Sequence, residues 1–77
     1  MTKLHLFEQA FHQEYPNSRV TIFTSSEVAI TESRMMKRTI EINPMGLERY
    51  TDAEVASIGK HEALHFLAYD GLYQPTV

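Results

Sequence analysis

Apolar residues in the first part of the chain recur at every third or fourth position. This spacing is typical of an amphipathic helix with one face against a core. The stripe consists of Leu4, Phe7, Phe11 and Tyr15. The polar, proline-containing segment 16–18 (PNS) follows it and interrupts the periodicity. The pattern therefore predicts a helix over residues 2–15.

The middle of the chain alternates between β-branched or other apolar residues and polar residues, which favours strands. Strands are predicted over residues 19–24 (RVTIFT), 27–31 (EVAIT) and 39–43 (TIEIN). The serines at 25 and 26 form a turn between the first two, and residues 34–38 (RMMKR) form a basic connector. Ile40 and Ile42 should face inward, and the segment PMG that follows should end the third strand.

The last helix carries the clearest local signals. Thr51 and Glu54 have the spacing of a capping box, and Tyr50 and Val55 have that of a hydrophobic staple. The helix should extend over Asp52–Tyr69 and stop at the following Asp-Gly pair. The order of helix, two or three strands and helix predicts an α+β domain.

A chain of 77 residues forms one small domain, 1–77, with a modest core. The absence of cysteine excludes disulfides, zinc–thiolate sites and thiol nucleophiles. A formal charge of −3 disfavours a nucleic-acid binder that depends on phosphate contacts. No apolar run has the length of a membrane helix, and the N-terminus does not resemble a signal peptide. We therefore expect a soluble, cytoplasmic protein without a membrane partner.

One motif points to chemistry. Residues 61–65 read HEALH, which is HExxH. Two histidines four apart on a helix lie one turn apart on the same face, so their imidazoles can converge on one tetrahedral metal ion. Glu62 then projects beside the metal, where a carboxylate can take a proton from a bound water. The alternative is a surface helix that carries two ordinary histidines and a glutamate.

The arrangement of TIEINP, a short spacer, a capped helix and HEALH resembles the core of zincin metallopeptidases, including the gluzincin and SprT-like groups. The resemblance covers residues 39–70. It implies a minimal zincin-like domain in which a strand lies along the substrate cleft. It further implies that His61 and His65 are metal ligands and that Glu62 is the general base.

The run HEALHFLAYD is also similar to the HGxLHLxGYDH signature of the YbeY family of metal-dependent rRNA-maturation endoribonucleases. The matching residues are His61, Leu64, His65, Tyr69 and Asp70. Glu62 stands where that family has glycine, and Gly71 stands where it has a third metal-binding histidine. The first difference favours the peptidase, whereas the second weakens both interpretations.

A catalytic zinc normally has three protein ligands and a water. Gluzincins take the third from a later glutamate and SprT-like proteins from a later histidine, and neither residue follows His65 here. Asp70 comes five positions after His65 and points away unless the helix has unwound. His5 and His12 share one stripe of the first helix, and either could be the third ligand if that helix packs beside the last one. His12 is the preferred candidate, and the alternative is that both are plain surface histidines. A symmetric homodimer that contributes a ligand in trans, or a domain that has lost this ligand, are alternatives.

The sequence thus predicts a zinc-dependent metallopeptidase that hydrolyses amide bonds in a protein or peptide, with Glu62 activating a water. Two other functions remain open. One is a catalytically inactive zincin-like protein that binds or inhibits a partner. The other is a YbeY-like RNA hydrolase, which the acidic charge and Gly71 disfavour.

Overall fold

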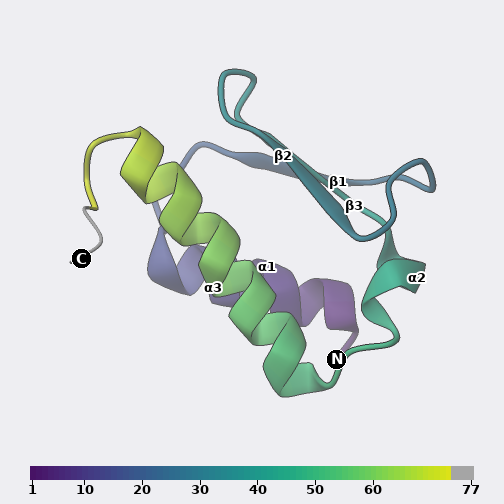
Figure 1. The fold of residues 1–77 in the computed structure, drawn as a ribbon. Helices are drawn as coiled ribbons and strands as arrows, with labels where there is room; N and C mark the ends of the chain where they lie inside the picture. Colours follow the sequence, from purple (N-terminus) through teal and green to yellow (C-terminus); the bar gives the residue numbers. More distant parts are fainter. Residues whose placement is uncertain (74–77) are drawn as a thin grey trace.

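The computed structural model describes residues 1–73, which form two layers, a three-stranded sheet and a layer of helices on one of its faces (Figure 1). The elements are α1 (Lys3–Glu14), β1 (Thr21–Thr24), β2 (Thr31–Arg34), β3 (Thr39–Ile42), α2 (Pro44–Leu47) and α3 (Asp52–Tyr69). This is the predicted α+β fold, with an N-terminal helix and the HExxH motif on the C-terminal helix. Within the described residues, no helix combines the length and hydropathy needed to cross a bilayer.

The sheet is mixed and has the order β1-β3-β2. β3 pairs in parallel with β1, with Ile22 opposite Ile40, and antiparallel with β2, with Ser33 opposite Ile40. Directly opposed residues share a face of the sheet, so these three side chains all point toward the helices. Ile40 and Ile42 are both fully buried, which confirms their predicted inward orientation.

The predicted second strand is wrong. Residues 27–30 form a loop, and β2 begins only at Thr31. Asn43, which follows β3, holds this loop. Its side chain donates to the carbonyl of Val28 (3.0 Å), and its backbone N–H donates to the carbonyl of Ile30 (2.9 Å). β2 itself is the polar segment TESR. It is an edge strand, held by pairing with β3 through a tight turn in which Arg38 has a φ of 53°. β2 therefore lacks the alternation of apolar and polar residues from which the other strands were predicted.

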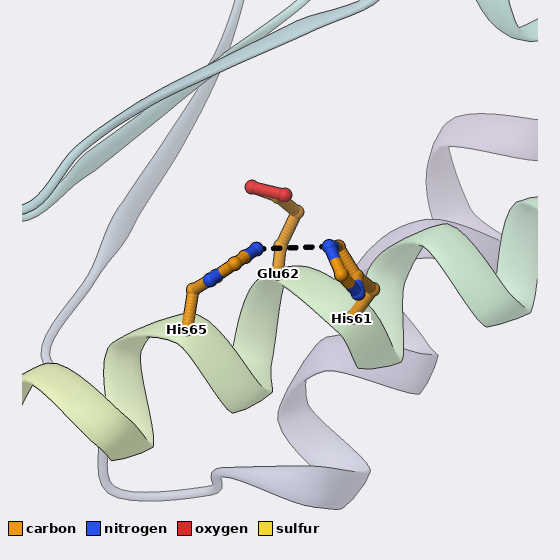
Figure 2. A group of neighbouring side chains, drawn as sticks. All are labelled: His61, Glu62 and His65. Carbon is orange, nitrogen blue, oxygen red and sulfur yellow. Dashed lines mark hydrogen bonds between the residues drawn. The ribbon is translucent and has the colours of Figure 1, made fainter. Parts of the chain in front are cut away.

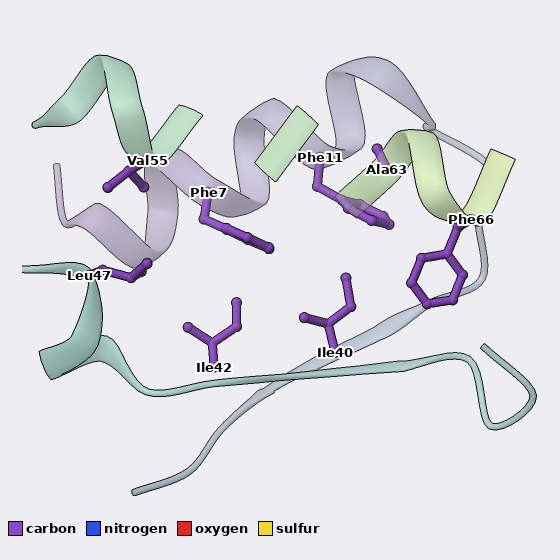
Figure 3. Packing of buried hydrophobic residues seen from close by; sticks show 8 residues of the cluster. All are labelled: Phe7, Phe11, Ile40, Ile42, Leu47, Val55, Ala63 and Phe66. Atoms are coloured by element: carbon purple, nitrogen blue, oxygen red, sulfur yellow. The ribbon is translucent and has the colours of Figure 1, made fainter. Parts of the chain in front are cut away.

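Eight side chains from both layers form the core (Figure 3). The fully buried members are Phe7, Phe11, Ile40, Ile42, Leu47, Val55, Ala63 and Phe66. The predicted stripe on α1 is confirmed, because Phe7 and Phe11 lie in this core and Leu4 and Tyr15 pack against it. Leu47 comes from α2, a short helix that begins directly after β3 with Asn43 as its N-cap.

The bounds of α3 match the prediction. The Thr51 side chain accepts from the Glu54 backbone N–H (3.2 Å), and the Glu54 carboxylate accepts from the Thr51 N–H (2.9 Å). The second of these bonds is the main reason that the pKa of Glu54 lies below its usual value. Val55 is buried and Tyr50 packs on the core, as a hydrophobic staple requires.

α3 approaches the backbone of α1 closely at Gly59, which is buried. A Cβ placed on Gly59 would lie 2.5 Å from the carbonyl oxygen of Phe7 and 3.2 Å from Cβ of Ala10. No larger residue fits there without moving one helix, so glycine sets the distance between α1 and α3.

A polar cluster joins the far end of α3 to the rest of the fold. The Asp70 carboxylate accepts from the Tyr15 hydroxyl (2.6 Å) and from both terminal nitrogens of Arg38 (2.8 and 2.9 Å). Arg38 also donates to the carbonyl of Ser18. The hydrogen bonds from Arg38 have the largest effect on Asp70, followed by the bond from Tyr15, and they lower the pKa of Asp70 to about 2. The same carboxylate raises the pKa of Tyr15.

We expect Gly59→Ala to destabilise the protein by about 1–3 kcal/mol, because the added methyl group forces the two helices apart. The higher helix propensity of alanine, worth about 1 kcal/mol, offsets only part of this loss. Urea denaturation measures the change. Ser57→Ala, at an exposed position of the same helix, should alter stability by less than about 0.5 kcal/mol. A Gly59→Ala protein as stable as wild type would contradict the close approach.

Asp70→Asn should lower the melting temperature most at neutral pH. The carboxylate has a lowered pKa in the folded state, so its stabilising contribution is complete above its unfolded pKa of about 3.9 and is lost as the pH falls toward 2. The difference in melting temperature between wild type and variant should therefore shrink between about pH 5 and pH 2. Glu48→Gln, at an exposed position, serves as the control. If the difference in melting temperature stays constant over this range, the Asp70 carboxylate does not stabilise the fold through the cluster.

Candidate metal centre

His61 and His65 lie one turn apart in the second half of α3, and both are exposed. Their rings meet edge to face, with centroids 4.4 Å apart and an angle of 86° between the planes. The two Nε2 atoms are 2.8 Å apart and form a hydrogen bond (Figure 2). The motif therefore has the predicted convergence, with both nitrogens directed at one point beside the helix.

Glu62 projects from the same side of α3 as the two imidazoles (Figure 2). One carboxylate oxygen and one nitrogen of each histidine all lie within 4.8 Å of one another. The side chain is half-buried, and its Oε1 atom accepts a hydrogen bond from the hydroxyl of Ser33 on β2. The carboxylate thus lies between the histidine pair and the edge strand of the sheet.

The donor atoms suit a divalent ion of the zinc type, which prefers imidazole nitrogen and carboxylate oxygen in the absence of thiolates. Bonds of 2.0–2.1 Å in a tetrahedral geometry place two ligand nitrogens about 3.3 Å apart. The present separation of 2.8 Å is that of a hydrogen bond, so the imidazoles would have to open by about half an ångström. Exposed side chains at a helix surface can make this adjustment by small rotations.

The other candidate ligands lie elsewhere. Among residues 1–73, the group that could hold a metal contains His61, Glu62 and His65, and neither His5 nor His12 belongs to it. His12 is exposed in the last turn of α1, and its role as third ligand remains a prediction. Asp70 is the C-cap of α3, and its carboxylate is held by Tyr15 and Arg38.

A hollow of about 240 Å³ adjoins the two histidines. Its lining consists of His61, Leu64, His65, Ala68 and Tyr73. The four helical positions, 61, 64, 65 and 68, are linked by steps of three or four residues, so they form one stripe along α3. A larger hollow of about 330 Å³ lies over the first turns of α3, beside Tyr50 and Ile58, and contains no histidine. Only the smaller one brings apolar surface next to the candidate metal ligands.

Ser33 is the residue of this site that the sequence analysis missed. The predicted second strand ended at Thr31 and the predicted connector began at Arg34, so Ser33 belonged to no predicted element and its side chain had no expected direction. A signal was nevertheless present. Had TESR been aligned against TIEI as a hairpin, Ser33 would have fallen opposite Ile40 and on the same inward face.

Comparison of the chain with protein-family models, with curated proteins and with solved structures gives no match.

Proposed function

We propose that this protein binds one divalent metal ion, zinc by its donor set, through His61 and His65, and that it hydrolyses amide bonds of a peptide. The observation that carries the proposal is the convergence of two imidazole nitrogens and the Glu62 carboxylate within 4.8 Å. The ion would supply Lewis-acid polarisation of a water and of the substrate carbonyl. The resemblance to the zincin core supports the same assignment.

Glu62 is the group that moves the proton. Its carboxylate lies beside the two imidazoles, and one of its oxygens accepts a hydrogen bond from Ser33 and not from either ring. The second oxygen is left to accept a proton from the attacking water. The protonated carboxyl then returns it to the amine that leaves, so that one residue serves as base and then as acid.

The surroundings favour a peptide over a nucleic acid. Besides the two histidines, the described residues that line the hollow are a leucine, an alanine and a tyrosine, and none of them is a lysine or arginine. An apolar hollow suits a side chain of a peptide substrate, whereas RNA binding depends on cationic contacts to phosphates. The net charge of −3 points the same way.

A second candidate function is a metal-dependent or metal-free binding protein without catalysis. It is favoured by one observation, namely that the described residues bring together two imidazoles but no third histidine. In such a protein the hollow and the motif would contact a partner, and Glu62 would have no proton to transfer.

Zinc should raise the melting temperature of the protein, and His65→Ala should abolish the rise. An ion at a hundredfold excess over its Kd stabilises a folded state by about 2.7 kcal/mol. At about 4–8 °C per kcal/mol for a domain of this size, the shift is roughly 10–20 °C. Thermal unfolding of untagged protein measures it, with EDTA as the reference. Identical curves with zinc and with EDTA would exclude the site.

His12→Ala and His5→Ala extend this experiment to the third ligand. Loss of the zinc-dependent shift in His12→Ala would assign His12 to the site, and retention of the full shift would exclude it. His5→Ala tests the second candidate on the same helix by the same criterion, and Gln13→Ala, at an exposed position of α1, is the control that should respond to zinc like wild type.

Glu62→Gln should keep the fold and the zinc-dependent shift but lose turnover by about 10²–10⁴-fold, because an amide cannot act as a general base. The glutamine oxygen can still accept from Ser33, so the structure is preserved. The assay compares both proteins on an unfolded protein and on a structured RNA, with and without zinc, and uses Glu27→Gln at an exposed loop position as the control. If wild type cleaves neither substrate under any metal condition, the catalytic function is wrong.

A further inference from the structure

Ser33 and Glu62 are 29 positions apart in the sequence and belong to different layers of the fold. Ser33 lies in β2 directly opposite the buried Ile40, so its side chain points toward the helices. There its hydroxyl donates to Oε1 of Glu62. A small polar residue on the inward face of the edge strand therefore contacts the carboxylate of the HExxH motif.

This is the one hydrogen bond that the described residues make to the Glu62 side chain. Both residues are half-buried, so water competes less for the contact than at an open surface. The carboxylate is attached through a flexible side chain, and the bond holds one oxygen on β2. The other oxygen makes no hydrogen bond with the described residues, and a carboxylate oxygen lies within 4.8 Å of a nitrogen of each histidine.

We infer that Ser33 is a positioning residue for Glu62. This inference rests on the proposed function, because it assigns to Ser33 the task of aiming the base. The bond has two consequences. It limits the rotation of the carboxylate to orientations that present a free oxygen for proton transfer. It also keeps the carboxylate from swinging onto the ion as a ligand, where it could no longer accept a proton.

Ser33→Ala should therefore lower kcat by roughly 10–100-fold, the scale of misplacing a catalytic group by about 1 Å, and should leave KM within about twofold. Zinc affinity should stay the same or increase, because the freed carboxylate can approach the ion. Thr31→Ala is the matched control. It lies on the same face of the same strand, opposite Ile42, and should keep wild-type kcat and zinc affinity.

Ser33→Thr and Ser33→Val separate the hydroxyl from the shape of the side chain. Threonine and valine are almost isosteric, and both favour a strand, so neither substitution should prevent folding. Threonine keeps the donor and should retain at least about a third of kcat. Valine lacks it and should lose activity like alanine. Equal activity of the two variants would overturn the inference.

A measurement on the metal-free protein tests the contact without any assay of activity. Ser33→Ala should lower the melting temperature more in the wild-type background than in the Glu62→Ala background, since the bond exists only in the first. Equal shifts in both backgrounds, or a wild-type kcat in Ser33→Ala, would overturn the positioning role alone. A wild type that does not cleave peptide would overturn the proposed function, and the positioning role with it.

Discussion

The close contact of α1 and α3 at Gly59 is the constraint on which the rest of this structure depends. Because the α3 backbone lies almost on that of α1, the rotation of α3 about its axis is fixed. Ala63 and Phe66, four and seven positions later, then face the core. Glu62 falls on the neighbouring stripe toward the sheet, and the histidines remain exposed. The orientation of the motif thus follows from one glycine in the preceding turn.

The other end of α3 is fixed by electrostatics. Asp70 at the C-cap is bound by Tyr15, the C-cap of α1, and by Arg38, the last residue of the turn between β2 and β3. The side chains of Asp70 and Arg38 are 19% and 31% exposed, so this pair is shielded more than an ordinary surface ion pair. It ties the strand that carries Ser33 to the helix that carries Glu62. The histidine pair lies between the two anchors, on a segment that cannot rotate or slide freely.

The parts of the fold with strong local signals could be predicted from the sequence. The capping box fixed the start of α3, and the spacing of Phe7 and Phe11 identified the buried face of α1. β2 could not be predicted in this way, since its position depends on pairing with β3 and not on its own polar sequence. For the same reason Ser33 was missed. The motif revealed its two histidines by spacing alone, whereas a third ligand from another element would depend on tertiary packing that no local pattern encodes.

The contact between His61 and His65 would take a different form in each of the two interpretations of the motif. As a plain hydrogen bond at 2.8 Å it requires one Nε2 atom to donate and the other to accept. A metal ion would require a lone pair from both nitrogens in place of the shared proton, and the two nitrogens would then lie about 3.3 Å apart. A pair of surface histidines would need nothing from Glu62, yet this carboxylate is held beside them by a hydroxyl from another layer of the fold. That bond pairs two half-buried polar groups and holds the carboxylate in place. Under the proposed function, the second carboxylate oxygen is the one that would take the proton.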